Sequence, residues 1–120
     1  MTALLIYKCL FDFSFAGHIP IHEKAIVSYN SLLWNHEQLL SLIHCHKNVI
    51  LYLAGHDHFG GYTVDNKGVH HLTINGLIEA KPGTLDSATF ELYPSKMIVK
   101  GSGRVSTFEI DLPYKTHDMT

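Results

Sequence analysis

The sequence has few cysteines, no excess of positive charge and no long uninterrupted apolar segment. Cys9 and Cys45 are its two cysteines and show no C-x-x-C spacing, so neither a zinc knuckle nor a disulfide framework is predicted. The net charge of −2, without a basic patch, argues against a nucleic-acid partner. No segment approaches the roughly 18 consecutive apolar residues of a membrane-spanning helix. We therefore expect a protein of the cytoplasm, a reducing compartment, that binds neither nucleic acid nor membrane.

The two ends of the chain carry little information. The first ten residues are apolar apart from Lys8, as in a signal sequence, but no positive charge precedes them and Asp12 interrupts their continuation. We expect a core strand pair or a helix–strand lead-in there. Residues 113–120 are polar, carry no motif and are expected to fray. The whole chain, at 120 residues, is long enough for one domain.

The most informative segment is an apolar run followed by two histidines. All six residues of Val49–Ala54 are apolar or aromatic, which predicts a buried strand, and Gly55 permits a sharp turn at its end. In extended backbone, His56 and His58 lie on one face, roughly 6–7 Å apart. Two imidazoles at the carboxyl end of a strand suit one divalent metal or two neighbouring metals. A pair of exposed loop histidines is the alternative at this point.

A second strand candidate, residues 11–15, also ends close to histidines. Its residues alternate between apolar and polar with a period of two. Because Pro20 biases the preceding residue away from helix, His18 and His22 do not form a helical pair. In an extended chain they are roughly 13 Å apart, too far to share a metal directly. At most one of them joins the later histidines, and His18, which follows the strand more closely, is the better candidate.

These motifs carry a resemblance to a known family. G-H-x-H after a buried strand, preceded by a strand ending in H-x-P, resembles the last two metal-binding motifs of calcineurin-like metallophosphoesterases. Further segments between residues 17 and 105 are similar to the C-terminal portion of the manganese-dependent ADP-ribose/CDP-alcohol diphosphatase family: 33–35, 54–62, 68–72, 76–79, 93–97 and 100–105. This combined series is highly specific for the family.

The resemblance implies an α/β fold, the C-terminal part of the αββα sandwich of metallophosphoesterases. The chain would form the second sheet and part of the first. We divide this partial metallophosphoesterase domain, residues 1–120, into an uncertain lead-in (1–16), the family-like region (17–105) and a C-terminal strand and tail (106–120). A half sandwich would expose apolar central strands such as Val49–Ala54, so we expect self-association through sheet faces.

The resemblance also implies a site and an activity. His18 and His56 would hold one metal and His58 the other. Mn²⁺ is the metal that the family implies, two per complete site, although imidazole also accepts Zn²⁺ or Fe. The implied reaction is hydrolysis of small-molecule nucleotide substrates, ADP-ribose or CDP-alcohols. Trp34 and Asn35 lie in a segment that, by resemblance, faces the nucleotide; a core position for Trp34 is the alternative.

The chain departs from the family by lacking its first three motifs, D-x-H, G-D-x-x-D and G-N-H-[DE]. No D-x-H and no G-D occur anywhere, so the carboxylate that normally bridges the two metals has no counterpart. N-H-E at residues 35–37 lacks the glycine and follows the H-x-P strand, so we reject Asn35 and His36 as metal or acid groups. We assign no catalytic residue and predict an incomplete two-metal site, inactive in this chain alone. The alternative is a truncated, non-catalytic product that binds one metal weakly or acts as an interaction partner.

The rest of the chain predicts one helix and further strands. Residues 31–47 carry an apolar stripe at helical spacing, with Ser31 or Asn30 as the cap. Strands are predicted over residues 69–74, 88–93, 97–100 and 105–110, and turns at 64–68, 93–96 and 101–104. His70 and His71 point to opposite faces of their strand, so at most one of them lines a metal site, and a structural role is the default.

Overall fold

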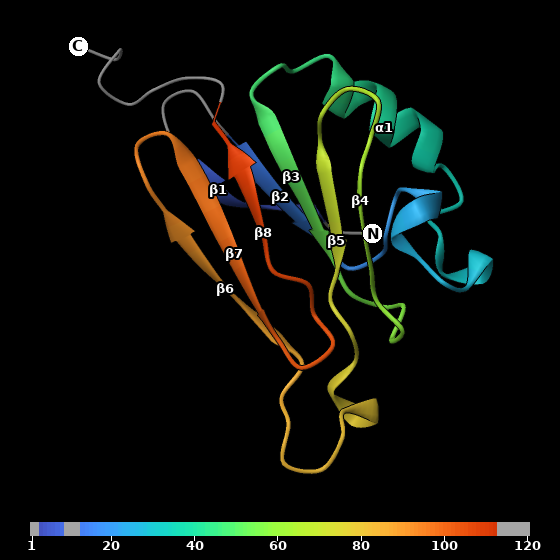
Figure 1. The fold of residues 1–120 in the computed structure, drawn as a ribbon. Coiled ribbons are helices and arrows are strands. Elements are labelled where there is room, and N and C mark those ends of the chain that lie inside the picture. The colour runs from blue at the N-terminus through green and yellow to red at the C-terminus, as the bar shows by residue number, and fades with distance from the viewer. Residues whose placement is uncertain (1–2, 9–12, 113–120) are drawn as a thin grey trace.

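The structure, a computed structural model, describes residues 3–8 and 13–112 (Figure 1). Within these residues, one sheet has the strand order β1-β2-β3-β5-β4 and a second has the order β6-β7-β8. The strands of the first are β1 (Ala3–Lys8), β2 (Phe13–Gly17), β3 (Val49–Ala54), β4 (Gly61–Val64) and β5 (His70–Thr73). Those of the second are β6 (Ser87–Leu92), β7 (Lys96–Ser102) and β8 (Phe108–Asp111). The helical elements are η1 (Glu23–Ala25), η2 (Tyr29–Ser31), α1 (His36–His44) and η3 (Leu77–Glu79).

The larger sheet is mixed. Strands β2, β3 and β5 run parallel, whereas β1 and β4 pair antiparallel at its edges. Leu53 is paired with Ala16 on one side and Leu72 on the other. The carboxyl ends of the three parallel strands therefore meet at one edge of the sheet, which is where ligands bind in open α/β sheets.

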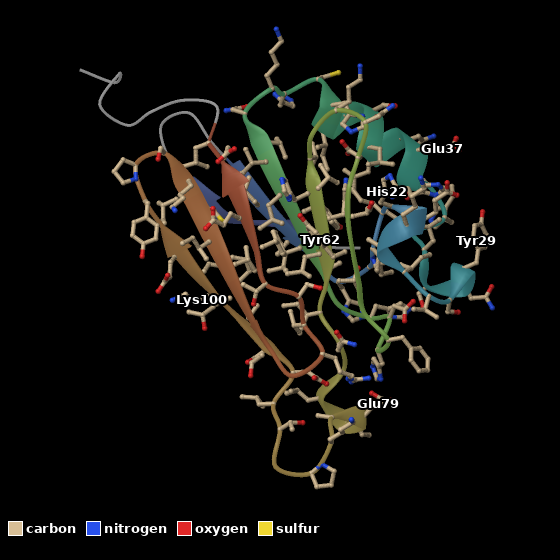
Figure 2. All side chains as sticks on the ribbon, viewed as in Figure 1. His22, Tyr29, Glu37, Tyr62, Glu79 and Lys100 are labelled. Atoms are coloured by element: carbon tan, nitrogen blue, oxygen red, sulfur yellow. The ribbon has the colours of Figure 1, made fainter. Side chains whose placement is uncertain are left out.

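The two sheets and α1 form three layers, with the larger sheet in the middle (Figure 1). One apolar cluster fills the space between the sheets and includes Leu51 from β3 and Val99 from β7. A second cluster joins the opposite face of the larger sheet to α1, through Tyr52 and Ile43. Tyr62 lies between the sheets (Figure 2), where its ring stacks on Phe108 with centroids 4.0 Å apart.

Strand β3 is thus covered on both faces by residues of this chain. Leu51 and Tyr52, which face opposite clusters, are each only 1% exposed. The prediction that this central strand would be exposed in a half sandwich is wrong, because β7 and β8 cover one face and α1 covers the other. The apolar run itself is explained by this burial on two sides.

The helix is shorter than the predicted span of 31–47. It begins at His36, and Asn35 rather than Ser31 or Asn30 is its N-cap residue, without a side-chain capping hydrogen bond. Upstream, the backbone N–H of Leu33 donates to the carbonyl oxygen of Pro20 at 2.9 Å. This long-range bond holds the backbone before the helix in a non-helical path, although Leu33 still packs in the core. The apolar periodicity of the sequence could not show that the residues before His36 lie outside the helix.

The predicted strands are confirmed, with shifted ends. Strand β8 begins at Phe108 rather than at residue 105, because the turn that contains Gly103, at φ 66°, reaches further than predicted. The predicted turn at 93–96 closes with a 2.8 Å bond from the N–H of Tyr93 to the oxygen of Lys96. The turn at 64–68 has Gly68 at φ 83°.

At the N-terminal end, Ala3–Lys8 is a strand paired with β2, so the strand-pair alternative is the one observed there. Predictions that concern residues 1–2, 9–12 and 113–120 fall outside the described residues. Among the described residues, no helix has the length and apolar character required to cross a membrane.

Candidate metal centre

Three histidines follow the parallel strands at the carboxyl edge of the larger sheet. His18 comes directly after β2, and His56 and His58 lie in the loop after β3. The backbone links the two loops, since the N–H of Gly55 donates to the carbonyl oxygen of His18 at 3.1 Å. Residues 38 positions apart in sequence are thereby brought side by side.

His18 and His56 form a close pair. Nε2 of His18 lies 3.1 Å from Nδ1 of His56, and the two rings meet edge to face with centroids 4.9 Å apart. Two nitrogens that bind one tetrahedral metal at about 2.1 Å are roughly 3.4 Å apart, so this spacing fits two ligands of a shared metal ion. It fits equally a hydrogen bond between two neutral imidazoles. Both rings are solvent-accessible, which an entering ion requires.

His56 adopts an unusual backbone conformation. Its φ is 68°, and among the described residues it is the one non-glycine residue with positive φ. The segment after β3 is therefore not extended, and the expectation that extended backbone would place His56 and His58 on one face is wrong. The turn that was assigned to Gly55 is made by His56 instead. A left-handed non-glycine residue costs on the order of 1–3 kcal/mol, and residues with such strain cluster at functional sites.

Asp57, between the two histidines, fixes this loop. Its Oδ2 accepts hydrogen bonds from the backbone N–H groups of Val27 and Ser28, both at 2.9 Å, and Oδ1 accepts one from Phe59 at 3.1 Å. Burial by itself would raise the pKa of Asp57, but these donors outweigh it and hold that pKa below its ordinary value. Asp57 is thus a buried anion that ties the histidine loop to residues 27–28, rather than a group available to a metal.

Tyr52 fixes the other loop. Its hydroxyl donates to the carbonyl oxygen of Ile19 at 3.0 Å, immediately after His18. Burial raises the pKa of Tyr52 to about 12, so the hydroxyl keeps its proton. Gly17 makes this contact possible, because a Cβ there would fall 2.0 Å from the tyrosine oxygen. The buried ring of Tyr52, which packs in the cluster between the larger sheet and α1, therefore also fixes the backbone next to His18.

The third histidine has a different neighbour. Nδ1 of His58 lies 3.0 Å from Oε1 of Glu79 in η3. Within the described part of the chain, no group of three or more His, Cys, Asp or Glu side chains is arranged to hold a metal ion. The pair His18–His56 fits a metal as a partial donor set, whose remaining ligands would come from water or from groups outside the described residues.

The other histidines near these strands lie elsewhere. The ring of His22 (Figure 2) packs against His71, with centroids 5.0 Å apart, and its Nδ1 accepts the N–H of Lys24 at 3.1 Å. His71 is buried and pairs with Asp65, while Nδ1 of His70 lies 2.7 Å from the Tyr62 hydroxyl between the sheets. Each of these three histidines is therefore held by a contact that lies away from the His18–His56 pair.

Trp34 is exposed rather than part of the core. Its exposed fraction is 87%, so the alternative of a tryptophan buried under the helix is wrong. Trp34 lines a surface cavity of about 480 Å³ together with Leu33, Asn35, Gln38, Leu39 and Leu42. An indole on an open, partly apolar surface can receive a flat ring.

Sequence reasoning missed the residues that hold the histidines in place. Asp57 could have been noticed as the one acidic residue inside G-H-D-H, a position where a buried carboxylate can accept backbone N–H groups. Glu79 and Tyr52 carry no local signal, because their contacts, to His58 and Ile19, join residues 21 and 33 positions apart.

No family model matches the chain, but individual proteins do. A protein from Danio rerio, named manganese-dependent ADP-ribose/CDP-alcohol diphosphatase, is 42% identical over 94 residues, 78% of this chain and 29% of the relative. Proteins of the same name from Mus musculus and Arabidopsis thaliana are 46% identical over 89 residues and 35% identical over 95. These alignments cover 74% and 79% of this chain, and 26% and 30% of the relatives.

This chain is a relative of the manganese-dependent ADP-ribose/CDP-alcohol diphosphatases. It spans less than a third of the length of these curated relatives. A solved structure, a dimetal phosphatase from Danio rerio, superimposes with a TM-score of 0.75 at 41% identity, covering 79% of this chain and 30% of that one. With the facing sheets, this match confirms the predicted fold class, part of the calcineurin-like αββα sandwich.

Proposed function

We propose that this chain contributes to the metal site of a hydrolase that acts on nucleoside-diphosphate-linked small molecules, ADP-ribose or CDP-alcohols. The observation that carries the proposal is the 3.1 Å spacing of the imidazole nitrogens of His18 and His56 at the carboxyl edge of the sheet. The names of the relatives, which state manganese dependence and these two substrate classes, support it. The dimetal phosphatase of the same fold supports a site for two metals.

In this proposal each residue has a defined part. His18 and His56 hold one Mn²⁺ ion and His58 contributes to a second; imidazole ligands also accept Zn²⁺ or Fe at these positions. Metal ions at such a site polarise phosphoryl oxygens and lower the pKa of bound water. Trp34 and Asn35 contact the nucleotide. Because Cys45 is a free, exposed thiol, a reducing cytoplasmic location belongs to the same proposal.

The second candidate function is non-catalytic: binding of one metal ion, without hydrolysis. Two observations favour it for the chain on its own. No group of three ligands is assembled within the described residues, and the sequence has no D-x-H or G-D motif to provide the bridging carboxylate. Two imidazoles bind a divalent ion weakly, and hydrolysis in two-metal sites depends on both ions.

A metal titration tests the shared part of both candidates. We expect the metal-free chain to take up at most one Mn²⁺ ion, weakly, as measured by the loss of the free Mn²⁺ signal in electron paramagnetic resonance. His18→Ala and His56→Ala should abolish that uptake. His46→Ala, at an exposed position after α1, is the matched control and should not. Uptake that survives both His18→Ala and His56→Ala would refute this pair as the metal site.

A hydrolysis assay separates the two candidates. With excess Mn²⁺, ADP-ribose hydrolysis by the chain alone should equal that of buffer, since the bridging carboxylate is absent. Turnover that His58→Ala eliminates would show that other groups complete the site and would favour the enzyme over the non-catalytic protein. The same assay with CDP-choline compares the two substrate classes.

A further inference from the structure

The short η3 turn, Leu77–Glu79, is attached to His58 by both backbone and side chain. The N–H of Gly76 donates to the carbonyl oxygen of His58 at 3.0 Å, and Oε1 of Glu79 lies 3.0 Å from His58 Nδ1. Gly76 packs so closely that a Cβ there would fall 2.5 Å from His58 Cγ and 2.8 Å from Glu79 Oε2. Glu79 lies on η3 at one end of the molecule (Figure 2), at the edge where β3 and β5 end.

An ion pair between the exposed Arg104 and the buried Asp86 holds this turn. Nη2 of Arg104 donates to the carbonyl oxygen of Gly76 at 3.0 Å. The guanidinium also donates to Oδ2 of Asp86, from Nε at 2.9 Å and from Nη2 at 2.6 Å, and the backbone N–H of Arg104 donates to Oδ1 at 2.8 Å. The Asp86 side chain is 1% exposed. A connected chain of contacts therefore runs from Asp86 through Arg104 and Gly76 to Glu79 and His58.

The Glu79 contact determines which nitrogen of His58 is free. An ionised carboxylate only accepts hydrogen bonds, so Nδ1 of His58 must donate and carry the proton. In the neutral ring, Nε2 then has the unshared electron pair. Metal-binding histidines commonly have such a partner, which fixes the ring orientation and makes the free nitrogen a better ligand.

We propose that Glu79 is a positioning residue for His58. Arg104 and Asp86 hold the η3 turn in the place that brings Glu79 to His58. Glu79 keeps the proton on Nδ1 and leaves Nε2 available to a divalent cation. This inference rests on the proposed function for its purpose, because His58 is a ligand only in that proposal. The tautomer itself is a property of the metal-free chain and can be measured separately.

The test is nitrogen NMR of the full chain at pH 8.5 without metal, with the His58 signals assigned by comparison with His58→Gln. In the wild type, we expect the shift pattern of the Nδ1–H tautomer. Glu79→Ala should move the pattern toward Nε2–H. Glu79→Gln, whose amide oxygen can still accept from Nδ1, should retain the wild-type pattern. Glu37→Ala, which removes an exposed carboxylate on α1, should change nothing at His58.

A second measurement concerns the cation. Transient contact of Mn²⁺ with His58, too weak to count as uptake, still broadens the His58 ring signals. In a His18→Ala/His56→Ala background, where no ion occupies the neighbouring pair, this broadening should require roughly tenfold more Mn²⁺ with Glu79→Ala than without it, and an unchanged amount with Glu79→Gln. An unchanged tautomer in Glu79→Ala, or the same change in Glu79→Gln as in Glu79→Ala, would overturn the inference, whether or not His18 and His56 bind a metal. If the wild-type chain takes up no Mn²⁺ at the His18–His56 pair while the tautomer results are as expected, the proposed function alone is refuted.

Discussion

His71 is joined to Asp65 through a 2.8 Å contact between Nε2 and Oδ2, while its other ring nitrogen, Nδ1, is buried without a hydrogen-bond partner among the described residues. Asp65 also lies 2.7 Å from Nε2 of His44 and accepts the backbone N–H groups of Lys67 and Val69. One carboxylate thus connects α1 to the turn between β4 and β5. These donors hold the pKa of Asp65 far below its ordinary value, although its burial acts in the opposite direction.

This arrangement predicts a loss of stability in mild acid. Burial lowers the pKa of His71 from 6.5 to about 4, with Asp65 opposing the effect. The unfolded chain therefore takes up the proton at higher pH than the folded one. The contribution of His71 to stability is full above pH 6.5 and is lost as the pH falls from 6.5 to about 4. At about 1.4 kcal/mol per pH unit, His71 accounts for about 3 kcal/mol.

Urea unfolding at pH 7 and pH 4 measures this effect. His22 and His70 also have pKa values lowered by burial, so the contribution of His71 is isolated by a variant. His71→Gln should reduce the pH dependence by most of that amount, whereas His46→Gln, at an exposed position, should not reduce it. Equal pH dependence in wild type and His71→Gln would contradict the assignment.

A second prediction concerns Asp57. Asp57→Asn replaces one acceptor oxygen by a donor amide, so at least one of the N–H groups of Val27, Ser28 and Phe59 loses its partner. A buried donor left unsatisfied costs about 1–3 kcal/mol, and we expect a loss of that size in the free energy of unfolding. Asp111→Asn makes the same chemical change at an exposed position of β8 and should cost less than about 0.5 kcal/mol. Equal losses in both variants would show that the Asp57 contacts contribute no stability.

The sequence predicted those parts of the fold that local pattern determines. The uninterrupted apolar run became β3, and the position of Gly68 marked a turn, because burial on two faces and positive φ each select residue types directly. The start of α1 was predicted wrongly, because the bond from Leu33 to Pro20 decides it, and that bond joins segments far apart in sequence.

The candidate site, too, could be predicted from the sequence only in part. Histidines at strand ends could be selected from their spacing, and the structure places His18 beside His56. The conformation of His56 and the partner of His58 could not be predicted, since they depend on Asp57 binding residues 27–28 and on η3 reaching His58. Residues that orient other residues have no periodicity of their own in a single sequence.

Two glycines near the site give a matched pair of variants. A Cβ at Gly61 would fall 2.5 Å from the backbone carbonyl of Ala25, which is itself buried in η1, whereas a Cβ at Gly55 would meet nothing within 4 Å. Gly61→Ala should therefore reduce the free energy of unfolding by about 1–3 kcal/mol through overpacking. Gly55→Ala should change it by less than about 0.5 kcal/mol, since its φ is not positive. A larger loss for Gly55→Ala would mean that the turn after β3 does depend on glycine.

The last prediction tests the proposed nucleotide contact of Trp34. Trp34 is the one tryptophan of the chain and is 87% exposed, so tryptophan fluorescence reports on this position alone. A base stacked on the indole contributes about 1–3 kcal/mol, whereas a sugar phosphate offers no ring to stack. ADP-ribose should therefore quench the fluorescence with saturation, and ribose 5-phosphate should not. Asn35→Ala should weaken the saturable quenching. If ADP-ribose quenches Trp34 only as it quenches free N-acetyltryptophanamide, linearly and without saturation, Trp34 does not contact the nucleotide.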